Sequence, residues 1–178
     1  MITCKLMGGL GNQLFQIFSI IAYGLENKVE FKFLYTVEVP SITPRHSYWD
    51  SFLNSIKIFT VKSLPNNLDL IEVPSGLYIP LKNLNISNSR NVLFHGYFQS
   101  YKFFEDKKTD IFRLIRLAQW KEKILMEMDF PDMVNTISIH FRLGDFKHLS
   151  HVHPIIPVKY YINALSNILS KCPEQKFK

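Results

Sequence analysis

The sequence predicts an α/β fold, and two stretches of the chain carry most of that prediction. Near the N-terminus, Ile2 to Leu6 is typical of a short buried strand, and Leu14 to Leu25 has apolar residues at helical spacing. The glycine-rich sequence Met7 to Gln13 lies between them. Residues 136–146 likewise combine an apolar run with a Gly-Asp break, and Pro157 opens a further helix. Strand, loop and helix in this order are typical of an open Rossmann-type sheet.

The remaining elements complete this prediction. Residues 29–40 have apolar side chains at alternate positions, which predicts a strand with one apolar face, and residues 91–99 predict another strand. Residues 106–128 predict one or two helices. We expect an N-terminal α/β domain over residues 1–132 and the start of a second α/β domain over residues 133–178.

Composition indicates a globular protein with an affinity for anions. Among the 178 residues, 47% are hydrophobic and 14% aromatic, which is enough for a sizeable core and excludes intrinsic disorder. The formal net charge is +6, but the Lys and Arg residues are scattered, so we expect no nucleic-acid partner.

Cysteine usage and the N-terminus indicate a soluble cytoplasmic protein. Cys4 and Cys172 form no CxxC motif, which argues against a disulfide framework or a structural zinc site. The N-terminal residues show no basic region followed by an apolar signal core, and the apolar stretch Leu14 to Leu25 is too short to span a bilayer. We therefore expect no transmembrane segment.

Two stretches can bind a phosphate. Arg142, with His140 and Asp145 around it, follows an apolar run, and a guanidinium there can form two charge-assisted hydrogen bonds to a phosphate. The alternative is an Arg–Asp ion pair that fixes a loop. The glycine-rich loop lets a ligand approach the backbone and exposes helix N–H groups, but it matches neither a P-loop nor GxGxxG, since Leu14 occupies the third glycine position. A plain tight turn is the alternative there.

An aromatic and polar cluster, Arg45 to Asp50, has two interpretations as well. It can pack the edge of a domain, or it can present an aromatic face to a sugar ring.

Four short segments, spread over nearly the whole chain, form one pattern. They are Gly8-Gly9-Leu10-Gly11-Asn12-Gln13-Leu14-Phe15-Gln16, Arg45-x-x-Tyr48-x-x-x-Phe52, Gly96-Tyr97-Phe98-Gln99-Ser100, and His140-x-Arg142-x-Gly144-Asp145-Phe146 followed by His153-Pro154 and Tyr160-Tyr161. In this order they resemble the α-1,2-fucosyltransferases of glycosyltransferase family 11. The resemblance implies a GT-B-like architecture, in which two α/β domains face a cleft that holds GDP-fucose. It also implies inverting transfer of L-fucose from GDP-β-L-fucose to the 2-hydroxyl of a galactoside, with no metal ion or other cofactor.

The resemblance assigns roles to particular residues. Arg142 would hold the β-phosphate of the donor, with His140 beside it, and Asp145 would orient Arg142. Gly9, Leu10, Gly11 and Asn12 would line the donor side of the cleft. A preorganised arginine suits this reaction, because charge grows on the diphosphate as the glycosidic bond breaks.

The base for the acceptor hydroxyl stays open. The candidates are His148, His151, His153 and Asp145, since histidine titrates near neutrality. We do not expect the three histidines to bind a metal, because no carboxylate or cysteine lies at ligand spacing.

Two departures from the family pattern bear on activity. Leu143 stands where the family commonly has a second arginine, which puts donor affinity in doubt. The second domain is shorter than the family pattern implies, so the chain is expected to be truncated there. The alternative to an active enzyme is therefore an inactive remnant, or a split half that binds nucleotide or carbohydrate and takes the missing part from a partner chain. In either case we expect a soluble protein of bacterial or viral type that can associate with membranes through its glycan pathway.

Overall fold

The computed structural model describes residues 1–39, 45–84, 91–128, 136–144, 147 and 154–174. Packing divides the chain into unit 1, Met1–Ile124, and unit 2, Leu125–Lys178. The strands are β1 (Ile2–Cys4), β2 (Phe33–Leu34), β3 (Glu38–Val39), β4 (Arg45–His46), β5 (Thr60–Val61), β6 (Asp69–Glu72) and β7 (Val92–His95). The helices are α1 (Leu10–Asn27), α2 (Lys108–Leu114), α3 (Leu117–Glu127) and α4 (Val158–Lys171), with short 3₁₀ helices η1 (Asn54–Phe59), η2 (Leu81–Asn83), η3 (Tyr101–Phe103) and η4 (Glu105–Lys107). The predicted domain boundary at residue 132 stays a prediction.

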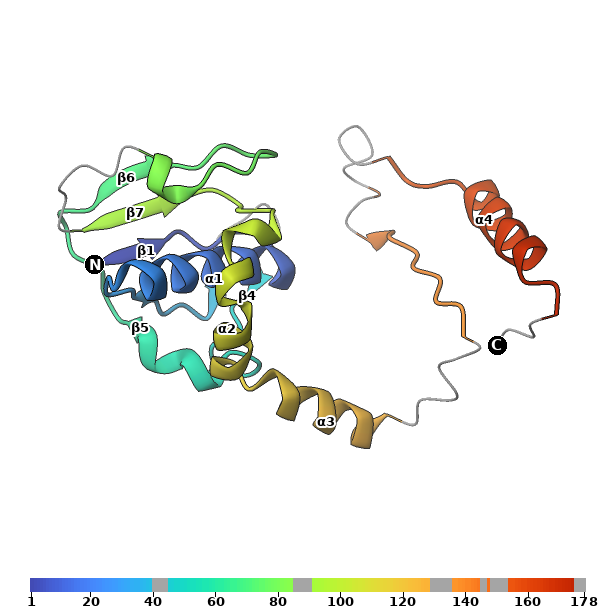
Figure 1. The fold of residues 1–178 in the computed structure, drawn as a ribbon, viewed down its shortest axis with the longest axis horizontal. Coiled ribbons are helices and arrows are strands. Elements are labelled where there is room, and N and C mark those ends of the chain that lie inside the picture. Colours follow the sequence, from blue (N-terminus) through green and yellow to red (C-terminus); the bar gives the residue numbers. More distant parts are fainter. Residues whose placement is uncertain (40–44, 85–90, 129–135, 145–146, 148–153, 175–178) are drawn as a thin grey trace. The chain divides into compact units, whose positions relative to one another are not determined.

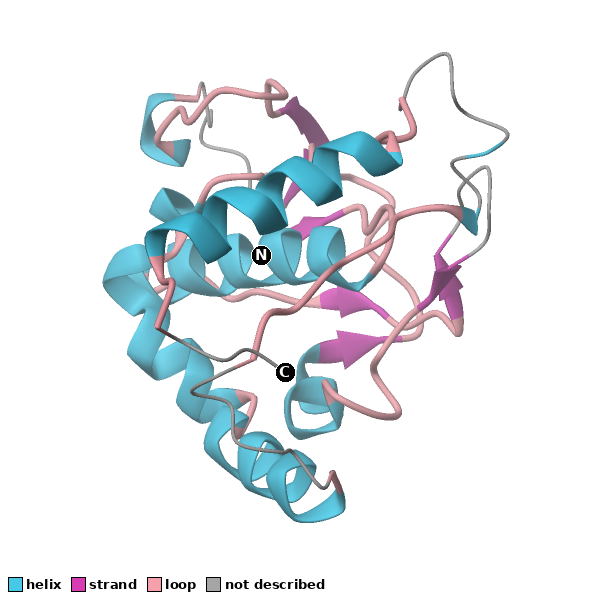
Figure 2. Cartoon of the chain, turned by 90° about the vertical axis from the view of Figure 1, so that its right-hand side faces the viewer, coloured by secondary structure: helices cyan, strands magenta, loops and turns pink. Residues whose placement is uncertain are grey.

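Unit 1 is built mainly on short parallel strands, and β3 and β4 form a separate antiparallel pair. Figure 2 draws all strands in magenta. Strand β1 pairs with β7, which in turn pairs with β6. On its other side, β1 meets the segment that leads into β2: Ile2 bridges to Phe31, and the Ile2 N–H donates to the Glu30 carbonyl at 2.8 Å. Strand β2 pairs with β5, also in parallel. The spatial order is therefore β6-β7-β1-β2-β5, which confirms the α/β class, whereas the GT-B arrangement stays a prediction.

Helix α1 covers this sheet, as Figure 1 shows in blue. The predicted helix at residues 14–25 is confirmed, and it extends to Leu10–Asn27. Its residues Ile17, Ile20 and Ile21 have no exposed surface and join the core. The ring of Phe18 lies edge-on against that of Phe104, with centroids 5.5 Å apart, which ties η3 and η4 to the helix. Burial on this scale fixes the position of the first turn of α1, where the candidate site lies.

One sequence prediction in unit 1 needs correction, and one that left two alternatives is settled. The strand expected over residues 29–40 is interrupted, because only β2 and β3 form within it and Val37 is 64% exposed between them. The helical stretch at residues 106–128 forms two helices, α2 and α3. They are separated at Arg116, whose φ of +56° is left-handed and stops α2.

Unit 2 differs from its prediction in one element. Residues 136–143 were expected to form a strand, but they pair with no strand among the described residues. β-branched side chains favour an extended backbone, yet a strand also needs a neighbour to bind its N–H and C=O groups. The final helix is confirmed as α4, with Pro157 at its N-cap and Cys172 at its C-cap. None of the helices in the described ranges combines the length and the hydrophobicity that a bilayer-spanning segment requires.

Candidate functional site

Two loops leave the same edge of the sheet in unit 1. Residues 5–9 follow β1, and residues 96–100 follow β7. Because β1 and β7 are neighbours and run parallel, both loops start at the carboxyl ends of their strands. In open α/β sheets, ligands bind outside these ends. The glycine-rich loop and the Gly96–Ser100 segment are therefore brought together by the fold.

The side chain of Gln16 anchors the loop between β1 and α1. Its Oε1 accepts from the Met7 N–H at 2.8 Å, and its Nε2 donates to the Met7 carbonyl at 3.1 Å. Gln16 has no exposed surface. A buried amide that binds both the N–H and the C=O of one residue holds that residue in place, because either group left unpaired would be costly.

Gln13 links the loop to a third segment. Its Nε2 donates to the Gly8 carbonyl at 3.0 Å and to the His46 carbonyl of β4 at 2.9 Å. Gln13 is also fully buried, and its Oε1 accepts no hydrogen bond within the described part of the chain. The first turn of α1, the loop and β4 are thus joined through one amide group.

Asn12 and Gln99 connect the two loops directly. The Gln99 Nε2 donates to the Asn12 Oδ1 at 3.0 Å, although the residues are 87 positions apart. Phe98 is 2% exposed and has a φ of +52°, so its ring points into the core while the left-handed backbone turns the next residue outward. With Oδ1 engaged, the Asn12 amide has its Nδ2 group as the donor for another partner.

The glycines of this loop serve different purposes. Gly8 has a φ of +74°, and a Cβ there would lie 2.4 Å from the Asn12 Nδ2. By contrast, a Cβ at Gly9 or Gly11 would meet no atom within 4 Å. Gly9 is the N-cap of α1, no side chain caps that end, and no acidic residue lies in its first turn. Open space beside exposed N–H groups and a positive helix end suits an anion.

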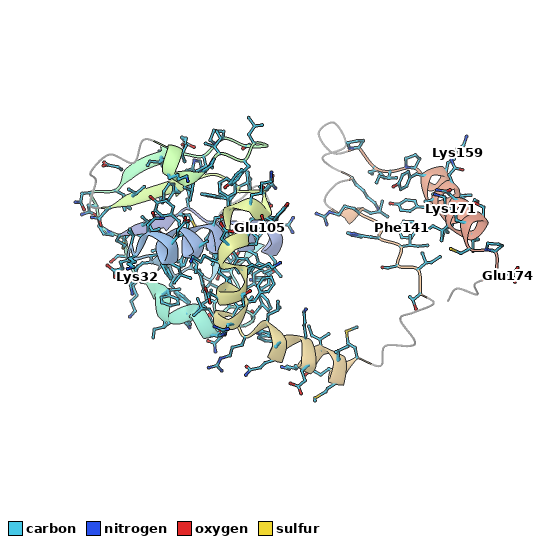
Figure 3. All side chains as sticks on the ribbon, in the orientation of Figure 1. Lys32, Glu105, Phe141, Lys159, Lys171 and Glu174 are labelled. Atoms are coloured by element: carbon cyan, nitrogen blue, oxygen red, sulfur yellow. The ribbon has the colours of Figure 1, made fainter. Side chains whose placement is uncertain are left out.

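In unit 2, His140 and Arg142 lie on residues 136–144, which pack against α4. The Tyr161 hydroxyl donates to the His140 carbonyl at 3.3 Å, and the ring centroids of Phe141 and Tyr161 lie 4.6 Å apart. Figure 3 labels Phe141 on this segment. The His140 and Arg142 side chains are exposed. The donor-binding role predicted for them stays a prediction.

The other candidates of the second unit fall outside the described residues. These are Asp145, His148, His151 and His153. Within the described part of the chain, no three His, Cys, Asp or Glu side chains gather to hold a metal. The metal independence of the reaction stays a prediction.

Some contacts of the site have little or no signal in the sequence, and the burial of one residue decides between two interpretations. Gln13 and Gln16 lie three positions apart on the face of α1 that also carries Ile17 and Ile20, and this spacing is the signal that could have found them. The contact between Asn12 and Gln99 has no local signal. Trp49 has no exposed surface, so it packs the domain edge and cannot offer a face to a sugar, which excludes the platform interpretation for this residue.

Comparison with known proteins gives one informative similarity. No family model matches the chain, and no solved structure matches it. The chain is 28% identical over 151 residues to a galactoside 2-alpha-L-fucosyltransferase of Caenorhabditis elegans. The alignment covers 79% of this chain but 37% of the relative, so the chain spans little more than a third of that protein's length. A distant and partial similarity of this kind supports a fucosyltransferase-like protein and no finer assignment.

Proposed function

We propose that this chain carries out, or forms part of, the transfer of L-fucose from GDP-β-L-fucose to the 2-hydroxyl of a galactoside. The observation that carries the proposal is the similarity to a galactoside 2-alpha-L-fucosyltransferase over 79% of the chain. The geometry of unit 1 supports it, because Gln13 and Gln99 join segments from three of the four motifs at one helix end.

The reaction is a single displacement with inversion. The acceptor oxygen bonds to the anomeric carbon as the bond to the diphosphate oxygen breaks, and GDP leaves with the electron pair. The proton of the acceptor hydroxyl passes to a base, for which Asp145, His148, His151 and His153 are the candidates. Arg142 binds the β-phosphate and stabilises its growing charge, since a fixed guanidinium needs no reorganisation as the bond breaks.

Unit 1 contributes a preformed polar surface to this reaction. The loop is held by Gln13 and Gln16, so little order remains to be gained when a ligand binds. Asn12 offers an amide donor, and the bare backbone beside Gly9 and Gly11 admits close approach. Exposed N–H groups at the start of α1 suit a phosphate of the nucleotide sugar.

The test is calorimetry with GDP-fucose on the full chain, with wild type beside Arg142→Ala. Loss of a desolvated arginine–phosphate contact should cost about 2–5 kcal/mol, which is a thirtyfold or greater loss of affinity. Arg113→Ala is the matched control, because Arg113 is an exposed arginine on α2 that pairs only loosely with Asp110 at 3.6 Å. A folded wild-type chain that does not bind GDP-fucose would contradict the proposal.

A binding module is the second candidate, favoured by the chain's 37% coverage of its relative. Incubation with GDP-fucose and lactose separates the two functions. Formation of fucosylated lactose supports the enzyme, whereas donor binding without any product supports a module that needs further polypeptide.

A further inference from the structure

One hollow of unit 1 lies outside the candidate site and has no role in the function proposed above. It is a groove of about 630 Å³ between the chain around η1 and the N-terminal half of α3. Its lining includes Asp50, Asn54, Arg116, Gln119, Trp120 and Lys123. None of these residues belongs to the two loops of the candidate site, and all lie in described parts of unit 1.

Trp120 gives the groove an aromatic wall. Its indole packs against Phe52, with ring centroids 5.6 Å apart, and it is partly exposed. The Lys123 Nζ lies 5.4 Å from the ring centroid, at the end of an exposed side chain. The chain has two tryptophans, and the other, Trp49, is fully buried. Trp120 is therefore the tryptophan that can present its ring to a ligand.

Asp50 supplies an oriented acceptor. The Tyr35 hydroxyl donates to its Oδ2 at 2.6 Å, and the Lys57 ammonium forms an ion pair with its Oδ1. The hydrogen bond from Lys57, followed by that from Tyr35, lowers the pKa of the Asp50 carboxyl. The carboxylate is ionised at neutral pH, and its remaining lone pairs can accept hydrogen bonds from hydroxyl groups.

Arg116 stands at the groove in a conformation that arginine rarely adopts. Its φ is +56°, at the end of α2, where glycine or asparagine is usual. A non-glycine residue held in the left-handed region is strained, and such strain often accompanies function. Arg116 and Gln119 are exposed, and with Asn54 they place N–H donors around the aromatic wall.

We propose that this groove binds a neutral saccharide, with a pyranose ring against Trp120 and its hydroxyls bonded to Asp50, Asn54, Gln119 and Arg116. A sugar ring combines an apolar C–H face with hydroxyls that both donate and accept, and the groove offers the matching surface. The lining carries charges of both signs, Asp50 against Arg116 and Lys123, together with two amides, and such a mixed set suits hydroxyls that both donate and accept hydrogen bonds. Because the groove shares no residue with the candidate donor site, this proposal does not depend on fucosyl transfer.

The experiment titrates the full wild-type chain with lactose and follows tryptophan fluorescence. We expect a saturable change in emission, because a sugar on Trp120 alters the environment of the exposed indole. Trp120→Ala should weaken lactose binding by about tenfold or more, measured by calorimetry, since a central aromatic contact is lost.

Arg116→Gly keeps the test independent of folding. Glycine adopts a φ of +56° without strain, so this variant should fold at least as well as wild type while lacking the guanidinium. We expect its affinity for lactose to fall about fivefold, the effect of one lost hydrogen bond.

Tyr78→Ala is the matched control, because it removes a 40% exposed aromatic ring outside the groove and should leave binding unchanged. Absence of lactose binding in the folded wild type would overturn the proposal. Equal affinities in wild type, Trp120→Ala and Arg116→Gly would overturn it as well.

Discussion

Unit 1 and unit 2 have similar patterns of apolar residues, but unit 1 buries these side chains far more completely than unit 2. In unit 1, the side chains of Phe33, Trp49 and Phe94 have no exposed surface. In unit 2, helix α4 has no buried residue, and Ile162 and Leu169 are 57% and 49% exposed. The difference teaches that an amphipathic pattern is enough to form a helix, whereas a core requires a second surface to pack against.

The apolar pattern of α4 shows this in detail, because its spacing predicts one buried stripe made of Tyr161, Ala164, Leu165, Ile168 and Leu169. Tyr161, Ala164 and Leu165 are half-buried, because residues 137–140 lie against them. Ile168 and Leu169, expected in the same stripe, are exposed. The helical prediction was right for this segment, and the burial prediction was wrong for its last turn.

The largest expected effect is on the free energy of unfolding, when one apolar side chain in each unit is replaced by alanine. Phe94→Ala should lower the free energy of unfolding by about 3–5 kcal/mol, because it opens a cavity in the core of unit 1. Ile162→Ala should change the free energy of unfolding by less than about 0.5 kcal/mol, since the side chain is 57% exposed. Urea denaturation measures both. The comparison fails if Ile162→Ala proves as costly as Phe94→Ala.

The next effect concerns the anchored loop. Gln16→Ala should cost about 2–4 kcal/mol, because it removes both hydrogen bonds to Met7 and leaves a buried space. Gln119→Ala, an exposed glutamine on α3, should be nearly neutral. Tryptophan fluorescence follows the unfolding of unit 1 alone, since Trp49 and Trp120 both lie in it. Equal midpoints for the two variants would mean that the Gln16 amide contributes little.

A smaller pair of effects distinguishes glycines within the same loop. Gly8→Ala should destabilise unit 1 by about 1–2 kcal/mol, because φ is +74° and the new Cβ meets Asn12. Gly11→Ala should stabilise unit 1 by about 0.4–1 kcal/mol, since its site is helical and open. Thermal melts rank the stabilities of wild type, Gly8→Ala and Gly11→Ala. A Gly11→Ala variant less stable than wild type would show that the space beside Gly11 is filled.

The smallest effect is electrostatic and lies in unit 1. Hydrogen bonds from Lys57 and Tyr35 lower the pKa of Asp50, because they stabilise its ionised carboxylate in the folded state. That contribution is present above the ordinary pKa of 3.8 and is lost as pH falls through the lower folded value. Asp50→Asn should therefore flatten the fall in stability on acidification below about pH 4. If Asp50→Asn and wild type lost stability equally as the pH falls, the hydrogen bonds of Asp50 would not contribute to the pH dependence of stability.

The sequence predicts the local elements of unit 1 and little of how they assemble. Strands β1 and β7 and helix α1 follow from apolar periodicity. The placement of β1 between β7 and the β2 segment does not, because strand neighbours are chosen by contacts far apart in the chain. Similarly, the glycine-rich loop is visible in the sequence, but its contact with Gln99 depends on the pairing of β1 with β7.

For unit 2, the sequence pattern of residues 136–143 is that of a strand, yet a strand is completed by its neighbours. No partner strand for it occurs among the described residues. Sequence periodicity carries no information about whether such a partner is available, and this is the physical reason for the wrong prediction.

The inward-facing amides of Gln13 and Gln16 have a consequence for how this motif can vary. Consecutive residues on an α-helix are rotated by about 100°, so Asn12 and Gln13 face different directions although they are adjacent. One turn of helix therefore carries the framework of the loop on one side and its contact surface on the other. Insertion or deletion of a single residue between Gly9 and Gln16 would turn residues of this helical turn to new directions. The buried amides and the contact surface would then both be displaced. The spacing of these residues should consequently be less tolerant of change than the identity of any one of them.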